Sequence, residues 1–192
     1  MWLRSIAKNM KDWNELLSEL GTLHESIGMF EDLKIFYEYT LKYKYNNILE
    51  IGILHGNSNR TFACAASVLP NTKITSVDIE QGCINECYAK LKNDGFEQYV
   101  TYVKSDSVKF LHQSNDNYWD CIFIDTDHRL TQTLAEIFLA GLKAKQNGGH
   151  IFMHDTGMQE VRDAIEVFKK YKKYKHTRFQ TNAGLDLLEL TQ

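Results

Sequence analysis

Five short apolar segments follow one another along the chain, and a segment with helical spacing follows each of them. Their apolar residues run almost continuously instead of alternating with polar ones, which is typical of strands buried on both faces of a parallel sheet. This pattern predicts an open α/β sheet with right-handed crossovers. Ser58 and Ser107 are expected to act as N-caps of the helices that they begin. The predicted strands are residues 48–52, 74–79, 99–103, 121–125 and 150–154, and the predicted helices are residues 58–69, 84–95, 107–113, 130–149 and 159–174.

The two ends of the chain depart from this alternation. Residues 177–181 and 185–190 are short apolar segments on either side of Asn182–Gly184, and a glycine at this point favours a hairpin. We therefore expect an antiparallel pair to close the sheet. Amphipathic helices are predicted around residues 10–20 and 29–43, so residues 1–45 are expected to form a helical extension packed on the core.

The composition is that of an ordinary globular protein of one domain. Of the 192 residues 43% are hydrophobic and 24% are charged, and the apolar runs are too short to span a bilayer. The net charge of −3 gives no general attraction to nucleic acid or to a membrane, so neither partner is expected. The beginning of the sequence lacks the apolar region of a secretory signal, and the four cysteines lack the spacing of a zinc site. We therefore expect reduced thiols and a cytoplasmic protein.

Candidate chemistry begins where the first predicted strand meets its helix. Gly52 permits a tight turn with close backbone approach, and Gly56 lies where the helix begins. The free N–H groups at a helix start can bind an anionic or carboxylate-bearing ligand. The spacing is Gly-x-x-x-Gly and not the Gly-x-Gly-x-x-Gly of dinucleotide-binding turns, which disfavours a nicotinamide-dependent dehydrogenase. A plain helix-entry turn is the alternative interpretation.

Acidic residues end the next two predicted strands. Asp78 ends the second strand, where a carboxylate commonly binds both hydroxyls of a ribose. Asp106, flanked by Ser105 and Ser107, follows the third strand. Each acid alone is typical of a helix cap. Together, at the carboxyl edge of the sheet where ligands bind in such folds, they predict a nucleoside pocket.

This combination of residues resembles the class I S-adenosylmethionine-dependent methyltransferases, and most closely their catechol, macrolide and sugar O-methyltransferase groups. The resemblance covers about residues 45–190, and Glu50 and Gly52 match the first motif of the family. It implies a Rossmann-like seven-stranded sheet, mostly parallel with the last strand antiparallel, with helices on both faces. It also implies an S-adenosylmethionine-binding methyltransferase domain over residues 46–192, with Asp78 on the ribose and Asp106 near the adenine. The expected cofactor-binding residues are Glu50, Gly52, Ile53, His55, Gly56, Ser58, Asp78, Ile79, Ser105, Asp106, Ser107 and Asp125.

A cluster of titratable residues follows the fourth predicted strand. Asp125, Asp127 and His128 lie close together in sequence, and His154 and Asp155 end the neighbouring fifth strand. Asp125, Asp155 and either His154 or Asp127 could supply ligands to one divalent ion, Mg²⁺ or Mn²⁺. A metal that holds an acceptor hydroxyl lowers its pKa, and a nearby base then removes the proton. His128 is our first choice as the catalytic base, with Asp127 second, because a histidine titrates near neutral pH.

The resemblance bears on this metal hypothesis. Metal-dependent members of the group bind metal through an Asp after the fourth strand and a pair of acids after the fifth, and some carry a base three positions after the first Asp. Asp125, Asp155 and His128 match these positions, whereas His154 replaces the first acid of the pair. We therefore assign the metal to Asp125, His154 and Asp155. The alternative is that these residues cap helices and bind only the methionine moiety or water.

The sequence thus predicts an S-adenosylmethionine-dependent methyltransferase that O-methylates a small hydroxylated metabolite, such as a sugar or a polyketide-like molecule, with a divalent metal. Two alternatives stay open: a metal-independent small-molecule methyltransferase, and a methyltransferase-like protein that binds the cofactor without catalysis. For the N-terminal helices, core packing, a lid over the substrate mouth and a homodimer contact are all open interpretations.

Overall fold

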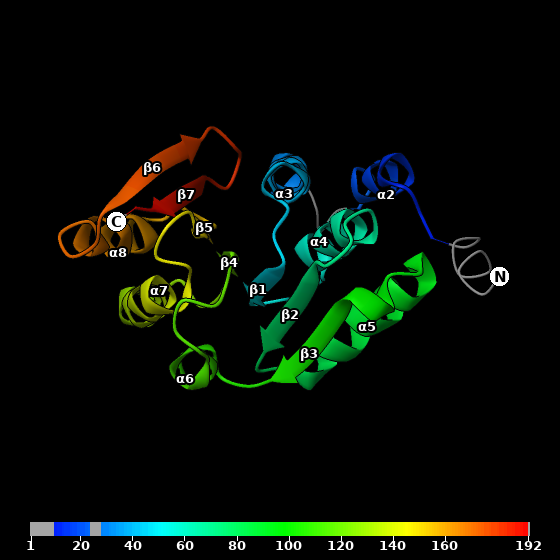
Figure 1. Cartoon of the computed structure of the whole chain (residues 1–192). Helices are drawn as coiled ribbons and strands as arrows, with labels where there is room; N and C mark the ends of the chain where they lie inside the picture. Colours follow the sequence, from blue (N-terminus) through cyan, green and yellow to red (C-terminus); the bar gives the residue numbers. More distant parts are fainter. Residues whose placement is uncertain (1–9, 24–27, 192) are drawn as a thin grey trace.

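The structure, a computed structural model, describes residues 10–23 and 28–191, which contain one seven-stranded sheet (Figure 1). The strands lie in the order β3-β2-β1-β4-β5-β7-β6. The first five are parallel, and β7 is antiparallel to both of its neighbours, so the predicted Rossmann-like α/β fold is confirmed. The strands are β1 Asn47–Ile51, β2 Lys73–Asp78, β3 Val100–Lys104, β4 Cys121–Ile124, β5 His150–Met153, β6 Tyr174–Phe179 and β7 Leu185–Leu190.

The central strands are apolar because both faces of the sheet are covered. Every residue of β4 and β5 is buried, and successive side chains of a strand point to opposite faces. One hydrophobic core therefore receives Ile48, Phe123 and Phe152, and the other receives Leu49, Ile122 and Ile151.

Helices cover the two faces separately. Apolar residues of α2, α3, α4 and α5 belong to the first core, and those of α6, α7 and α8 belong to the second (Figure 1). The helices are α2 Trp13–Leu20, α3 Phe30–Tyr43, α4 Asn57–Ser67, α5 Gln81–Asp94, α6 Ser107–Gln113, α7 Leu130–Lys143 and α8 Gln159–Phe168, with a 3₁₀ turn, η2, at Glu97–Tyr99.

Both predicted N-caps are corrected by the structure. The N-cap of α4 is Gly56, which has a φ of 75°, and Ser58 is the second residue of that helix. The N-cap of α6 is Asp106 and not Ser107, because the Asp106 carboxylate accepts a hydrogen bond of 2.8 Å from the backbone N–H of Lys109. Asp106 therefore combines a capping role with a position beside the predicted nucleoside pocket.

Two helix ends and one strand also differ from the prediction. Helix α7 ends at Lys143 because the backbone N–H of Lys145 donates to the carbonyl of Trp119, just before β4. Helix α8 ends at Phe168 and β6 begins at Tyr174, earlier than expected, because β6 pairs with β7 over its whole length.

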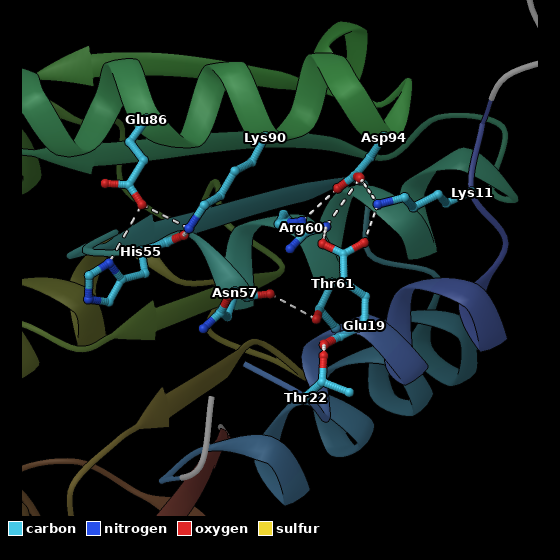
Figure 2. Close-up of polar contacts among 10 residues, drawn as sticks. All are labelled: Lys11, Glu19, Thr22, His55, Asn57, Arg60, Thr61, Glu86, Lys90 and Asp94. Carbon is cyan, nitrogen blue, oxygen red and sulfur yellow. Dashed lines mark hydrogen bonds and ion pairs between the residues drawn. The ribbon is translucent and has the colours of Figure 1, made fainter. Parts of the chain in front are cut away.

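A network of charged side chains joins the N-terminal segment, which contains Lys11 and helix α2, to helices α4 and α5 (Figure 2). Arg60 of α4 is buried, and its guanidinium contacts Asp94 of α5 and Glu19 of α2, each at 2.6 Å. Lys11 joins the same two acids, with its ammonium 2.6 Å from Asp94. Arg60 and Asp94 are buried, whereas Lys11 and Glu19 are partly exposed, and the network joins α2 to α4 and α5.

None of the helices in the described part of the chain is both long enough and apolar enough to cross a membrane.

Candidate active site

A cavity of about 600 Å³ opens at the carboxyl ends of β1, β2, β4 and β5. This is the edge at which open α/β sheets bind ligands, and the volume is typical of a site for a small molecule or cofactor. Gly28 and Met29, at the start of α3, also line it, so the N-terminal segment contributes to its wall. The lining residues are Gly28, Met29, Ile51–Leu54, Val77–Glu80, Cys83, Ser105–Ser107, Asp125–Arg129, Gln132, His154, Asp155 and Ala183.

The floor of the cavity depends on Gly52. Its φ is 84°, and a Cβ at this position would lie 1.9 Å from the carbonyl oxygen of Asp125. A side chain would therefore force apart the ends of β1 and β4, where the strands pair. The absence of a Cβ therefore lets the ends of β1 and β4 approach each other closely at the floor of the cavity.

Asp78 is held at the cavity by the backbone of two loops. Its carboxylate accepts hydrogen bonds from the N–H groups of Ile53, at 2.9 Å, and Glu80, at 2.8 Å. These contacts orient the carboxylate at the end of β2, in the position from which it was predicted to bind ribose hydroxyls. The neighbouring Ile79 side chain is 61% exposed, so it offers the cavity an apolar surface.

The predicted cofactor residues fall into two groups. Gly52, Ile53, Asp78, Ile79, Ser105, Asp106, Ser107 and Asp125 line the cavity, whereas Glu50, His55, Gly56 and Ser58 are not among its lining residues. His55 lies over α5, where its ring is 3.6 Å from Glu86 (Figure 2). The roles of all these residues in binding the cofactor stay predictions.

Glu50 lies completely buried behind the turn. Its carboxylate accepts hydrogen bonds from Ser58 at 2.5 Å, and from Asn59 and Ser76, both at 2.7 Å. Burial raises the pKa of Glu50 to about 7, although these hydrogen bonds oppose the shift. The arrangement indicates that Glu50 supports the cavity from behind by joining the start of α4 to β2.

The predicted metal ligands converge at one end of the cavity. Asp125, His154 and Asp155 each offer a ligand atom, and these three atoms lie within 4.8 Å of one another. The Nδ1 atom of His154 is 3.3 Å from Asp125 and 3.4 Å from Asp155. Asp155 has a φ of 52°, so the backbone after β5 turns through an uncommon conformation that places its carboxylate beside this histidine.

Asp32 of α3 supports His154 from the other side of its ring. Its carboxylate is fully buried and lies 3.1 Å from Nε2 of His154. With a proton on Nε2 donated to Asp32, Nδ1 keeps a lone pair, and this buried atom has no hydrogen-bond partner among the described residues. Metal-binding histidines commonly use one nitrogen for the metal and give the other N–H to a carboxylate. The residues present therefore fit a divalent cation.

His128 and Asp127 have different surroundings. The Nε2 atom of His128 is 2.9 Å from Asp155 and 3.6 Å from Asp125, so this ring belongs to the ligand cluster. Asp127 instead faces Arg129, with a contact of 2.6 Å, and its side chain is 46% exposed. Both line the cavity, but His128 is the better placed to exchange a proton with a ligand beside Asp125.

The electrostatics of the metal-free cluster follow from these contacts. Burial alone would lower the pKa of His154, but Asp125, Asp155 and Asp32 outweigh it and raise the pKa to about 12. Asp125 and Asp155 raise the pKa of His128 to about 9. The two histidines in turn hold the pKa of Asp155 well below its ordinary value. Without a metal, two imidazolium cations therefore face the carboxylates of Asp125, Asp155 and Asp32.

Asp32, Thr126 and Gln132 are among the contributors to this site that sequence reasoning missed. Asp32 carries a sequence signal, because it is an acid beside Leu33 on the buried face of an amphipathic helix. Thr126 and Gln132 also line the cavity, but nothing in the sequence distinguishes them from ordinary residues of a loop and a helix start.

A family model described as a methyltransferase domain matches residues 49–156, which is more than half of the 192 residues. Among curated proteins, the tapetum-specific methyltransferase 1 of Arabidopsis thaliana is 29% identical over 126 residues. This match covers 59% of the present chain and 53% of the plant protein, so the chain spans about half the length of that relative.

Solved structures of methyltransferases have a similar fold. The O-methyltransferase TomG from Streptomyces achromogenes, in complex with S-adenosylmethionine, matches with a TM-score of 0.71 and 17% identity over 99% of this chain and 95% of its own. The methyltransferase PaMTH1 of Podospora anserina, bound to S-adenosylhomocysteine, gives a TM-score of 0.74 and 13% identity over 98% and 93%. An O-methyltransferase from Bacillus cereus, also with S-adenosylhomocysteine, gives 0.67 and 16% over 98% and 96%. The family match shows that the chain belongs to the methyltransferase-domain family, and it shares its fold with these solved methyltransferases that hold S-adenosylmethionine or S-adenosylhomocysteine.

Proposed function

We propose that this protein transfers a methyl group from S-adenosylmethionine to a hydroxyl oxygen of a small metabolite, with a divalent cation bound by Asp125, His154 and Asp155. The observation that carries the proposal is the convergence of these three ligand atoms within 4.8 Å at one end of the cavity. Two solved structures with the same fold are named as O-methyltransferases and contain the cofactor or its product.

Different residues of the cavity would bind the cofactor and the acceptor. Asp78 would bind the ribose hydroxyls, and the backbone turn at Gly52, which lines the cavity, would lie beside the methionine part of the cofactor. The sulfonium of the cofactor supplies the methyl group as the electrophile. Met29 and Ala183 line the cavity from α3 and from the loop between β6 and β7, and they offer apolar contacts for an acceptor.

Deprotonation of the acceptor is assigned to His128. A divalent cation at the cluster supplies Lewis acidity, which lowers the pKa of an acceptor hydroxyl. In the metal-free protein His128 holds its proton because Asp125 and Asp155 stabilise the imidazolium. If those carboxylates held a divalent cation, they would stabilise the imidazolium less, the pKa of His128 would fall, and His128 would be able to take the hydroxyl proton.

A groove beside the cavity offers room for the rest of the acceptor. It shares Asp127, His128 and Arg129 with the cavity and continues along Leu130, Met158 and Glu160. Leu130 and Met158 are 36% and 42% exposed, and Arg129 and Glu160 add charged groups. Apolar surface with a few polar groups suits a small hydroxylated metabolite with an apolar part, such as a polyketide-like molecule or a sugar conjugate.

The proposal is tested by turnover with defined additions. The purified protein, S-adenosylmethionine and a panel of hydroxylated acceptors are incubated with Mg²⁺, with Mn²⁺ or with EDTA, and S-adenosylhomocysteine is measured by mass spectrometry. We expect turnover that requires the metal and is abolished in Asp125→Asn. Turnover that persists in EDTA and in Asp125→Asn would remove the metal from the mechanism.

A metal-independent methyltransferase is supported by one specific observation. The two imidazolium groups offset part of the negative charge of Asp125, Asp155 and Asp32 without any cation. The same assay separates the two functions, because the metal-independent enzyme would keep its full rate in EDTA. Tight binding of S-adenosylmethionine without turnover on any acceptor would instead favour a binding protein.

A further inference from the structure

A fully buried acid, Glu136 of α7, lies behind the cavity on the side of α6. It is not among the lining residues, yet it contacts three residues that are. One carboxylate oxygen accepts a hydrogen bond from Ser107 at 2.5 Å and from Gln132 at 3.0 Å, and the other accepts from Thr126 at 2.7 Å. Three elements of the cavity wall therefore converge on one carboxylate.

An ionised carboxylate accepts hydrogen bonds but cannot donate them, so Glu136 takes up the hydrogens of its neighbours. The hydroxyl hydrogens of Ser107 and Thr126 both point to Glu136. The amide nitrogen of Gln132 donates to Glu136 and, at 2.8 Å, to the oxygen of Ser107. This leaves the lone pairs of the two hydroxyls and the amide oxygen of Gln132 as the groups that these side chains can offer to a ligand.

We propose that Glu136 is a specificity-determining positioning residue, which fixes the side chains of Ser107, Thr126 and Gln132 as hydrogen-bond acceptors toward the purine base of the cofactor. The inference rests on the proposed function, because it assumes that the cavity binds S-adenosylmethionine. Ser107 is adjacent to Asp106, the residue predicted to lie near the adenine, and the Asp106 carboxylate is itself an acceptor.

This arrangement would distinguish purines by the exocyclic group that they carry at one edge. Adenine has an amino group there, which donates hydrogen bonds, whereas hypoxanthine has a carbonyl oxygen, which accepts them. The fixed acceptors of Ser107, Thr126 and Gln132 can bind the amino group of adenine. The carbonyl oxygen of hypoxanthine would instead face the lone pairs of these acceptors. Sites built to bind a polar group reject an analogue that cannot pair with them, because their buried polar atoms then stay unsatisfied.

The test compares two product analogues that differ only at this edge, S-adenosylhomocysteine and S-inosylhomocysteine, by isothermal titration calorimetry. We expect the wild-type protein to bind the adenine compound at least about tenfold more tightly. In Glu136→Gln an amide nitrogen takes the place of one carboxylate oxygen and donates to either Ser107 or Thr126, so the hydrogen of that hydroxyl becomes available to the ligand, and the ratio of the two affinities should fall. Glu166→Gln, the same change at an exposed position of α8, should keep the wild-type ratio.

A second variant keeps the test decisive if Glu136→Gln does not fold. Gln132→Met removes the amide oxygen from the wall and should weaken binding of S-adenosylhomocysteine while leaving that of S-inosylhomocysteine nearly unchanged. Equal affinities for the two compounds in the wild-type protein would overturn the role of Glu136 but leave the proposed methyl transfer intact. Binding of neither compound would overturn the proposed function, and the inference with it.

Discussion

The carboxylate of Asp32 lies 3.1 Å from Nε2 of His154, although the two residues are 122 positions apart in the sequence. Asp32 belongs to helix α3 of the N-terminal segment, and His154 directly follows β5. Both side chains are buried. The N-terminal segment is therefore part of the candidate metal site as well as part of the hydrophobic core.

Replacing Asp32 by Asn should weaken metal binding. The amide is neutral and holds the His154 N–H less strongly, so Nδ1 becomes a poorer and less well oriented ligand. Loss of such a supporting partner typically lowers metal affinity by about 10- to 100-fold. Titration of the protein with Mn²⁺ by calorimetry measures the effect. Glu31→Gln, a neighbouring and exposed position on the same helix, is the matched control and should bind Mn²⁺ as the wild-type protein does. Unchanged affinity in Asp32→Asn would show that His154 does not need this partner.

The fold was predictable because its signals are local. The central strands are apolar at nearly every position, and no other common element combines that pattern with intervening helices. The topology then brings Asp78, Asp125 and Asp155 to one edge of the sheet without any knowledge of contacts. The boundaries were less predictable: Ser58 looks like a cap in sequence, but the backbone turn at Gly56 starts the helix earlier.

The parts of the site that sequence reasoning missed depend on packing between distant elements. Asp32 and Glu136 are both buried acids on the core-facing sides of helices. A sequence pattern shows that such an acid needs a partner, but it does not show which one. Their partners, His154 for Asp32 and Ser107, Thr126 and Gln132 for Glu136, become evident only when the helices are placed on the sheet.

The histidine in the metal site should influence which ion binds. Imidazole favours ions such as Co²⁺ and Ni²⁺ relative to Mg²⁺, whereas carboxylates favour Mg²⁺. His154→Asp should therefore shift the preference toward Mg²⁺, but the new carboxylate would face the buried Asp32. We expect the single variant to be destabilised by the two unpaired acids, and the double variant Asp32→Asn with His154→Asp to fold.

The metal preference is measured as the ratio of the Co²⁺ and Mg²⁺ affinities. In the double variant this ratio should fall by at least about tenfold from that of the wild-type protein, since one nitrogen ligand has become an oxygen ligand. Asp32→Asn alone is the control, because it retains the imidazole and should retain the preference for Co²⁺. An unchanged ratio in the double variant would mean that His154 does not ligate the ion.

Gly52→Ala should remove both stability and cofactor binding. The residue has a φ of 84°, and the added Cβ would meet the carbonyl oxygen of Asp125 at 1.9 Å. We expect the free energy of unfolding to fall by at least about 2 kcal/mol, measured by urea denaturation, with loss of S-adenosylhomocysteine binding. Gly82→Ala, where a Cβ meets nothing within 4 Å, is the matched control and should be neutral or stabilising by up to about 1 kcal/mol. Normal cofactor binding by Gly52→Ala would contradict the assignment of this turn.

Stability should decrease in mild acid because of His150 at the start of β5. Its ring is 1% exposed and contacts the hydroxyl of Tyr45, and burial lowers its pKa to about 4 from the ordinary 6.5. Between these two values the unfolded chain binds the proton and the folded protein does not, so the free energy of unfolding falls as the pH falls from 6.5 toward 4. The loss attributable to this histidine is on the order of 2 kcal/mol. Urea denaturation at a series of pH values should show a shallower pH dependence in His150→Gln, whereas His112→Gln, an exposed histidine on α6, should retain the wild-type slope. If His150→Gln retains the wild-type slope as well, the acid sensitivity originates elsewhere in the protein.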